Sequence, residues 1–420
     1  MGAVLRGPKH REALLRCQIC RLGRAPHPAA LMFSSLRSSI AGLGLFGALS
    51  ILTFALVTFA QGPDPAQLFQ DAYAAQQRGE TTVAIRKYEE LIRLHPDMTA
   101  ARANLGVVLA SLGRFDEAIV QYRAALEQVP GNPALRLNLA LAYYKKGDFP
   151  LAAGEFSSLH EAEPGDVRVA TLLGQCYVRL GRDAEVISLL MPFEKANPGN
   201  LDLEWALGSA LIRSDRTEEG AERVEKVAEQ GHNAEAYMLA AQSYLKLAAF
   251  DKARRNFDAA MRLNPHLPGL YTLGGMIMDN SGDSQGAAGA FQKALEANPN
   301  DFEARLRLGA VLYDQRQLDA AKKQLERAVE LDLASGVARY ELARVERAQG
   351  QLDAAVKDLE KVVRAEPDWL PPHIELVALY YRLKRPEDGA REKRIVDRLS
   401  AEEQQRTSKS RIIAPTIPSH

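Results

Sequence analysis

From about residue 65 onward, stretches of roughly a dozen residues have apolar side chains three or four positions apart, with charged residues between them. The stretch Phe115–Glu127, FDEAIVQYRAALE, is an example. This spacing predicts amphipathic α-helices. Each such stretch begins shortly after a glycine and ends shortly before a proline. Glycine readily forms a left-handed helix C-cap and proline cannot continue a helix, so the pattern predicts an all-α chain of short helices in pairs.

The pattern repeats about every 34 residues. Prolines occupy the same place in seven repeats: Pro96, Pro130, Pro164, Pro198, Pro265, Pro299 and Pro367. Leu333 stands where an eighth proline is expected. A glycine, or once an alanine, precedes each proline by seventeen residues: Gly79, Gly113, Gly147, Gly181, Ala248, Gly282 and Gly350. A fixed period of this length predicts a stacked solenoid, in which each helical pair buries its apolar face against the next.

Three further places in the repeat describe how two helices pack. The eighth and twentieth places hold mostly small residues, for example Gly106 and Ala118 in the second repeat. The twenty-fourth place is bulky, as at Tyr122. Small residues allow two helices to cross closely, and the bulky residue fills the space on the same helical face.

The segment Ala103–Pro133, ANLGVVLASLGRFDEAIVQYRAALEQVPGNP, has most signature places of the tetratricopeptide repeat, and the chain resembles that family. The resemblance implies a right-handed α-solenoid of about ten helix-turn-helix repeats over residues 65–403. Their expected bounds are 65–98, 99–132, 133–166, 167–200, 201–233, 234–267, 268–301, 302–335, 336–369 and 370–403.

Two of these repeats differ from the others. The fifth has Asp215 for the glycine, Gly220 for the small residue and Val224 for the bulky residue, and it is one residue short, so we expect a softer joint there. The second helix of the tenth repeat is highly charged, as expected for a terminal cap whose outer face meets water. We expect the tail, 404–420, to be disordered.

The first 60 residues have a different composition. Residues 1–37 form a basic extension, and Met32 is favoured as the true start. Residues 38–60 are uncharged and apolar, with small residues before Gln61. This pattern predicts a cleaved signal peptide, or alternatively a retained single-pass inner-membrane anchor. Both alternatives place the repeats outside the cytoplasm, in the periplasm or secreted, because the basic flank stays inside.

Composition and motifs limit the classes of function. Lys plus Arg and Asp plus Glu number 53 each, and this neutral balance favours neither nucleic acid nor a membrane surface as a partner. We therefore expect membrane contact only through the N-terminal apolar segment. Cys17-x-x-Cys20 has no second cysteine pair to complete a zinc site. A Gly-x-Gly-x-x-Gly match at residues 42–47 lies inside the apolar segment, with no preceding strand.

The repeats show no catalytic signature. No HExxH, GxSxG or Walker motif occurs, and the five histidines after residue 60 are scattered: His95, His160, His232, His266 and His373. All but His160 lie near repeat junctions, where we expect solvated loops. Cys176 is expected in the core. We predict no catalytic, cofactor or metal site, and no enzyme activity.

The resemblance implies that the first helices of the repeats line a concave groove. In the family the second, fifth, ninth, twelfth and thirteenth places tend to face the groove, and the sixth often holds Asn. The residues this implies are Leu137, Asn138, Leu141, Tyr144, Lys145, Arg168, Arg179, Trp205, Arg213, Met238, Gln242, Lys246, Tyr340 and Arg344. Aromatic and Arg side chains suit peptide capture, because they combine large contact area with directed polar groups. Alternatively, several of these side chains pack against the next repeat.

One column of the repeat is basic in four consecutive copies. Lys145, Arg179, Arg213 and Lys246 all occupy the thirteenth place. A stack would align them into a positive stripe able to meet an acidic chain. A basic residue near a helix C-terminus also complements the helix dipole, which would explain the column without any ligand.

These observations favour a non-enzymatic scaffold of a bacterial cell envelope that holds a protein or peptide segment in its groove. The alternative is an accessory of polysaccharide export or assembly, in which the stripe meets an acidic glycan or its synthesis machinery.

Overall fold

The computed structural model describes residues 64–413, which form twenty α-helices and no strand. The all-α prediction is confirmed, and so is the arrangement as a solenoid of helical hairpins. The chain divides into two compact bodies, one ending at Ala210 and the other beginning at Leu211. The N-terminal body contains α3 (Pro65–Gln77), α4 (Thr81–Leu94), α5 (Thr99–Ser111), α6 (Phe115–Gln128), α7 (Pro133–Lys146), α8 (Phe149–Ala162), α9 (Val167–Arg179), α10 (Asp183–Glu194) and most of α11 (Leu201–Arg213).

The C-terminal body contains the helices from α12 onward. They are α12 (Thr217–Gly231), α13 (Ala234–Lys246), α14 (Phe250–Leu263), α15 (Leu270–Asn280), α16 (Ser284–Ala297), α17 (Phe302–Asp314), α18 (Leu318–Leu331), α19 (Gly336–Ala348), α20 (Leu352–Ala365), α21 (Leu370–Arg382) and α22 (Pro386–Ile413). The boundary between the bodies lies within the fifth repeat, the one that departs most from the pattern.

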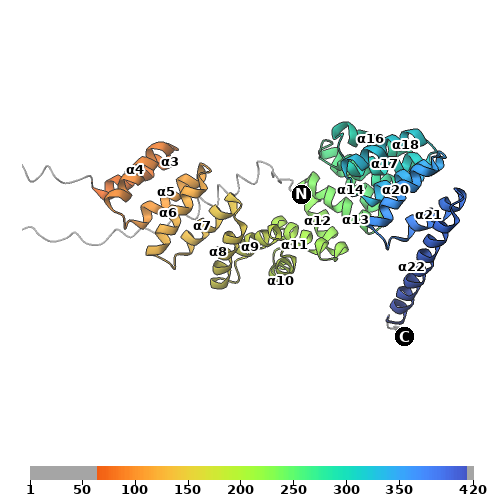
Figure 1. Cartoon of the computed structure of the whole chain (residues 1–420). Coiled ribbons are helices and arrows are strands. Elements are labelled where there is room, and N and C mark those ends of the chain that lie inside the picture. The colour runs from red at the N-terminus through yellow and green to blue at the C-terminus, as the bar shows by residue number, and fades with distance from the viewer. Residues whose placement is uncertain (1–63, 414–420) are drawn as a thin grey trace, which may run out of the picture. The chain divides into compact units, whose positions relative to one another are not determined.

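Each helix from α3 to α10, and each from α12 to α22, packs against its neighbour along the chain, and the ribbons form a series of antiparallel hairpins (Figure 1). The first helices of successive repeats also touch: α3 contacts α5, and α5 contacts α7. In the C-terminal body the same relation joins α13, α15, α17 and α19. First helices therefore share one face of each body, as the groove prediction requires.

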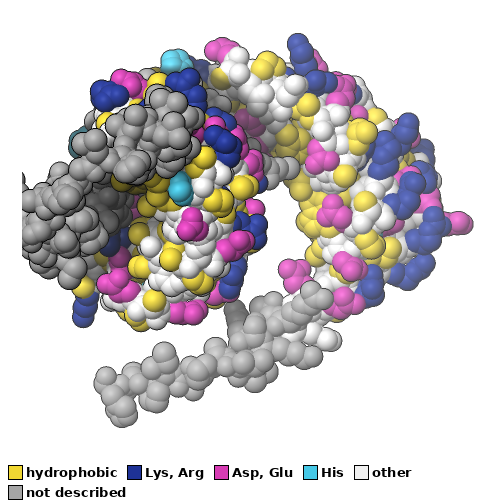
Figure 2. Space-filling view, turned by 90° about the vertical axis from the view of Figure 1, so that its left-hand side faces the viewer, with side chains coloured by type: hydrophobic (Ala, Val, Ile, Leu, Met, Phe, Trp, Pro, Cys, Tyr) yellow, Lys and Arg dark blue, Asp and Glu magenta, His cyan; other side chains and the backbone are white. Residues whose placement is uncertain are grey.

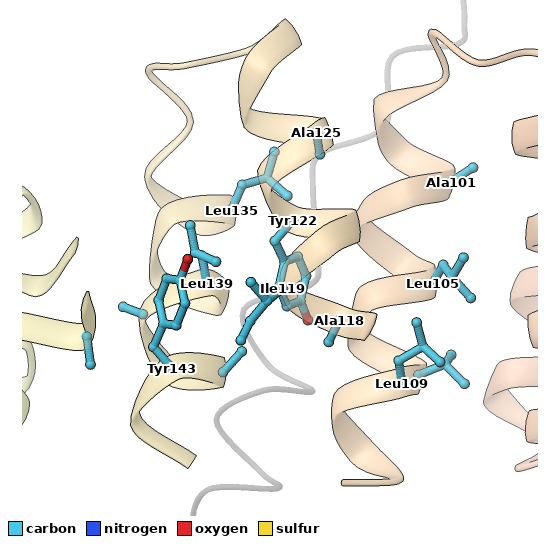
Figure 3. Packing of buried hydrophobic residues seen from close by; sticks show 14 of the residues in the cluster. Ala101, Leu105, Leu109, Ala118, Ile119, Tyr122, Ala125, Leu135, Leu139 and Tyr143 are labelled. Carbon is cyan, nitrogen blue, oxygen red and sulfur yellow. The ribbon is translucent and has the colours of Figure 1, made fainter. Parts of the chain in front are cut away.

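The small residue at the eighth place is required by the bulky residue sixteen positions later. A Cβ added to Gly106 would lie 2.5 Å from the Tyr122 ring, and one added to Gly275 would lie 2.5 Å from the Phe291 ring. Tyr122 lies on α6 beside Ile119 and Ala118, and it belongs to the same buried cluster as Leu105 and Leu109 of α5 (Figure 3). The predicted close crossing of the two helices is confirmed.

The turn between the two helices of a repeat uses a left-handed residue. Gly113 and Gly147, for example, have φ of +76° and +90°. In four repeats a residue other than glycine takes the same conformation: Asp215, Ala248, Arg316 and Lys384, with φ between 56° and 62°. These positions carry backbone strain, because a Cβ disfavours this region.

Five repeats have a polar contact that we call the brace. The side chain at the fourth place of the first helix bonds a backbone carbonyl six residues earlier and a side chain nineteen residues later. Arg136, for example, donates to the Pro130 carbonyl at 3.2 Å and pairs with Glu155 at 2.8 Å. The other braces are centred on Arg102, Arg305, Arg339 and His373. The brace joins the loop of one repeat to both helices of the next.

The expected C-terminal boundary differs from the structure. We expected the array to end at 403 and disorder to follow, whereas α22 continues to Ile413. The physical reason is composition, because residues 401–413 contain no glycine or proline to end the helix. Residues 414–420 of the expected tail lie outside the described residues, as do the basic extension 1–37 and the apolar segment 38–60.

Candidate functional site

We call the residues at the second, fifth, ninth, twelfth and thirteenth places of the first helices the first-helix face. In the N-terminal body its best-defined part joins α7 and α9. The Tyr144 hydroxyl donates a hydrogen bond to Gln175 Oε1 at 2.9 Å. The Tyr144 ring meets Phe149 edge-on, with centroids 5.7 Å apart. Arg179 lies over the Phe149 ring, with its guanidinium carbon 5.8 Å from the ring centroid.

The structure therefore brings the predicted residues Tyr144 and Arg179 together through Phe149, while Lys145 follows Tyr144 directly and is exposed. Sequence reasoning missed Gln175, although it occupies the ninth place of its repeat. It also missed Phe149, which begins the second helix of the third repeat and so lay outside the set of places considered.

The predicted basic column is not uniform. Lys145 and Arg179 form no ion pair with a carboxylate anywhere in the part of the chain with described side chains. Lys246 lies 3.3 Å from Asp215 Oδ1, with both side chains largely exposed. Arg213 also belongs to the C-terminal body and is exposed. The surroundings of the basic column thus differ between the two bodies. Lys145 and Arg179 belong to the N-terminal body, and Arg213 and Lys246 belong to the C-terminal body.

Three other predicted residues lie in the N-terminal body. The exposed Arg168 pairs with its own helix cap, Asp166, at 2.7 Å. This hydrogen bond holds the pKa of Asp166 below its usual value. Asn138 on α7 and Trp205 on α11 are half-buried.

The C-terminal body has a second aromatic and arginine cluster, between α17 and α21. The Tyr340 ring lies 5.1 Å from the Trp369 ring. Arg344 lies over Tyr313 with its guanidinium carbon 4.6 Å from the ring centroid, and donates to Glu341 Oε2 at 2.7 Å. Tyr340 and Arg344 were predicted. Tyr313 and Trp369 were not.

The two clusters use the same register. Tyr144 and Tyr313 occupy the twelfth place of their repeats, and each contacts the ninth-place residue of the next repeat, Gln175 or Arg344. The repeat therefore positions one aromatic side chain and one polar side chain against each other across neighbouring first helices. The exposed edges of these pairs are available to a partner.

Acidic groups on the C-terminal body's face change its electrostatics. Burial raises the pKa of Glu341, and the nearby Arg344 opposes this shift. Burial likewise raises the pKa of Asp279 on α15, with Arg307 opposing and Asp314 adding to the shift. Acidic, basic and apolar side chains are interspersed over the surface seen in Figure 2.

Packing against neighbouring repeats, the alternative open from the sequence, applies to several residues. Leu137, Leu141 and Tyr144 are partly buried against the core of the N-terminal body. Met238 is half-buried and its methyl group lies near Gly269, while Gln242 is exposed. These side chains support the stack and also leave part of their surface in solvent.

The remaining candidate chemistry is structural. Cys176 is fully buried as predicted, and burial raises the pKa of its thiol to about 12. His373 was expected in a solvated loop, but it is 3% exposed and forms a brace with Glu392 and the Pro367 carbonyl. Among residues 64–405, no group of three or more His, Cys, Asp or Glu side chains is arranged to hold a metal ion. No described helix combines the length and the apolar character needed to span a membrane.

Three family models, each described as the tetratricopeptide repeat, match the chain. One matches residues 69–133, the second 109–176 and 281–345, and the third 234–267 and 337–368. Together they cover just over half of the chain. They leave out residues 177–233, where the structure nonetheless contains the helices α10, α11 and α12.

Solved structures of similar proteins match parts of the chain, while no curated protein matches it in sequence. MamA residues 41-end from Desulfovibrio magneticus RS-1 is 27% identical, with 40% of this chain and 96% of that chain covered and a TM-score of 0.38. A tetratricopeptide repeat protein from Parabacteroides merdae is 18% identical, covering 60% and 100%, with a TM-score of 0.44. YrrB, described as a tetratricopeptide repeat protein with an unusual peptide-binding site, is 22% identical, covering 47% and 97%, with a TM-score of 0.37.

Proposed function

Because the chain belongs to the tetratricopeptide repeat family, we propose that it is a non-enzymatic scaffold that binds a protein or peptide segment on its first-helix face. The observation that carries the proposal is the recurrent pair of an aromatic twelfth-place residue and a polar ninth-place residue, in both bodies. Such pairs combine a rigid apolar surface with directed hydrogen-bonding groups, which is the composition of binding hot spots.

The cluster around Tyr340 supports this role in more detail. Tyr340 is half-buried against Trp369, so its ring is held in place before any partner arrives. Arg344 is fixed by Glu341 and by the Tyr313 ring. Preorganised side chains lose little conformational entropy on binding, and this favours affinity.

We further propose that the scaffold works in a bacterial cell envelope, outside the cytoplasm. This rests on the sequence of residues 1–60, whose basic flank and apolar stretch are typical of an export signal or an anchor. N-terminal sequencing of the protein recovered from cells would distinguish cleavage after Ala60 from retention. A protein that stays in the cytoplasm with an intact N-terminus would refute the proposed location.

The binding role is tested by crosslinked pull-down from envelope extracts, with wild type compared with the double variant Tyr340→Ala, Arg344→Ala. Truncation of two hot-spot side chains should weaken binding of any partner held there by about tenfold or more. Lys361→Ala and Arg364→Ala on the second helix α20 form the matched control. A partner set that neither variant changes would remove this cluster from the binding surface.

The second candidate is binding of an acidic glycan, as an accessory of polysaccharide export or assembly. The observation that favours it is the pair of exposed cations Lys145 and Arg179, because ammonium and guanidinium groups form charge-assisted hydrogen bonds with the carboxylates of an acidic polymer. Retention of a purified polyuronate on the immobilised protein, lost as salt rises, would support this candidate.

A further inference from the structure

Three consecutive first helices of the N-terminal body carry basic side chains and no acidic ones. The first helices α5, α7 and α9 contain no aspartate or glutamate, and they carry six basic residues: Arg102, Arg136, Lys145, Lys146, Arg168 and Arg179. Each of the second helices α4, α6, α8 and α10 contains at least two acidic residues. The first helices α5, α7 and α9 therefore carry an excess of positive charge that their own residues do not balance, whereas α3 and α11 contain acidic residues.

Four of the six basic side chains are engaged within the body. Arg102 and Arg136 form braces, Lys146 pairs with Asp116 at 2.5 Å, and Arg168 pairs with Asp166. Lys145 and Arg179 are the two that form neither a brace nor an ion pair with a described carboxylate. Both lie at the C-terminal end of their helices, on adjacent repeats.

The surroundings of Arg179 suit a carboxylate ligand. Its guanidinium lies over the Phe149 ring, and a guanidinium offers a planar set of N–H donors that matches a carboxylate. Gln175 and the Tyr144 hydroxyl lie on the same part of the face, and the partly buried Leu137 and Leu141 supply apolar surface beside them. A ligand that matches this surface has carboxylates next to apolar or aromatic side chains.

We propose that this face of α5, α7 and α9 binds an acidic peptide segment of a partner protein, with Lys145 and Arg179 contacting its carboxylates and the apolar surface contacting neighbouring side chains. This inference rests on the proposed scaffold function and specifies the chemistry of one of its ligands. A peptide is favoured over a glycan because the two cations adjoin Leu137, Leu141 and the aromatic pair, which an acidic sugar polymer has no apolar side chains to match.

The C-terminal body does not offer the same chemistry. Its first helices carry acidic residues among the basic ones, including Asp279, Glu303 and Asp314, and Lys246 is paired with Asp215. Acidic segments should therefore select the N-terminal body and should not bind the corresponding face of the C-terminal body.

The test is a selection of random peptides of about twelve residues, displayed on phage, against the full-length protein as recovered from cells. Enriched peptides should be acidic and contain apolar or aromatic residues. The double variant Lys145→Glu, Arg179→Glu should weaken their binding by roughly tenfold or more, because two attractive contacts become repulsive. Binding should also weaken as salt is raised, because these contacts are exposed.

The matched control is Lys146→Glu, Arg182→Glu, which makes the same change in net charge. Both control residues are exposed cations with internal partners, Asp116 and Glu185. This variant should bind the enriched peptides within about twofold of wild type, since its cations are already paired. Circular dichroism of both variants checks that each remains helical.

The outcomes are distinguishable. Enriched peptides that are not acidic, or that bind both double variants equally, would overturn the inference while leaving a binding scaffold in place. No enrichment at all would count against the scaffold function itself. Retention of polyuronate by wild type but not by Lys145→Glu, Arg179→Glu, without any peptide enrichment, would overturn the inference in favour of the glycan.

Discussion

Ala248 occupies a backbone conformation that six other repeats assign to glycine. Its φ is +56°, and its amide donates to the Leu245 carbonyl in the turn that ends α13. The left-handed conformation costs a residue with a Cβ about 1–2 kcal/mol. Replacement by glycine removes this cost but makes the unfolded chain more flexible, which offsets about 0.4–1 kcal/mol. The variant Ala248→Gly should therefore be more stable by about 0.5–1 kcal/mol.

The reverse substitution, glycine to alanine, measures the same free-energy cost of the left-handed conformation with the opposite sign. Gly147 has φ of +90°, and a Cβ built there meets no atom within 4 Å. The variant Gly147→Ala should therefore lose about 0.5–1 kcal/mol through backbone strain alone. Ala320→Gly, at an exposed site within α18, is the control for the chemical change itself. It should lose up to about 1 kcal/mol, because glycine is a poor helix former.

Urea unfolding followed by circular dichroism gives the three free-energy changes. Repeat arrays can unfold in parts, so hydrogen exchange of amides in α13 and α14 would show whether the gain from Ala248→Gly is local to its hairpin. The reasoning fails if Ala248→Gly destabilises the protein, or if Gly147→Ala leaves its stability unchanged.

Three further predictions concern buried residues. Gly275→Val should lower the free energy of unfolding by about 1–3 kcal/mol, because its side chain would overlap the Phe291 ring; a Phe291→Ala change in the same chain should recover part of the loss, and additive losses would contradict the packing account. Cys176 should react with iodoacetamide at pH 8 only after unfolding, as measured by mass spectrometry of its peptide, because a pKa of about 12 leaves almost no thiolate; rapid native labelling would contradict this. Burial raises the pKa of Glu346, so its ionised carboxylate destabilises the folded state at pH values above the pKa that Glu346 has in the unfolded chain. Glu346→Gln should therefore stabilise the protein at pH 7, and this gain should shrink as the pH falls and Glu346 becomes protonated. A stability difference in urea titrations that does not change with pH would be inconsistent with this account.

The helical hairpins and their close packing could be predicted because the relevant contacts are local in sequence. Gly106 and Tyr122 lie sixteen residues apart in one hairpin, and the same spacing recurs in Gly275 and Phe291. The period therefore specifies both the elements and the residues that touch. The extension of α22 could also have been expected from the lack of any glycine or proline between 401 and 413.

The brace was missed for a physical reason. Arg102, Arg136, Arg305 and Arg339 recur at one place and are visible in the sequence, but one of their acceptors is a backbone carbonyl, which leaves no sequence signature. Leu333 illustrates this, because it replaces the usual proline and its carbonyl still accepts from Arg339.

The candidate site was predicted in part. Alignment by repeat selected Tyr144, Tyr340 and Arg344, which lie in side-chain clusters in the structure and whose role in binding stays a prediction. It treated the thirteenth-place cations as equivalent. They are not, because Asp215 replaces a turn glycine and places a carboxylate beside Lys246. The sequence shows Asp215 as a departure of the fifth repeat. Its contact is with Lys246 on α13, the first helix of the following repeat, and a comparison of repeats one at a time does not reveal contacts between them.

The brace has a mechanical consequence. When the two ends of an array are pulled apart, a braced junction separates only if two things happen. The polar contacts that link both helices of one repeat to the preceding loop must break, and the apolar side chains buried between the two repeats must become exposed. The junctions before α9, α13 and α15 lack this arrangement, since Ala170, Tyr237 and Tyr271 occupy the fourth place. Under tension these junctions are expected to separate first. The order in which repeats unfold would then be set by the braces rather than by the size of the apolar contacts.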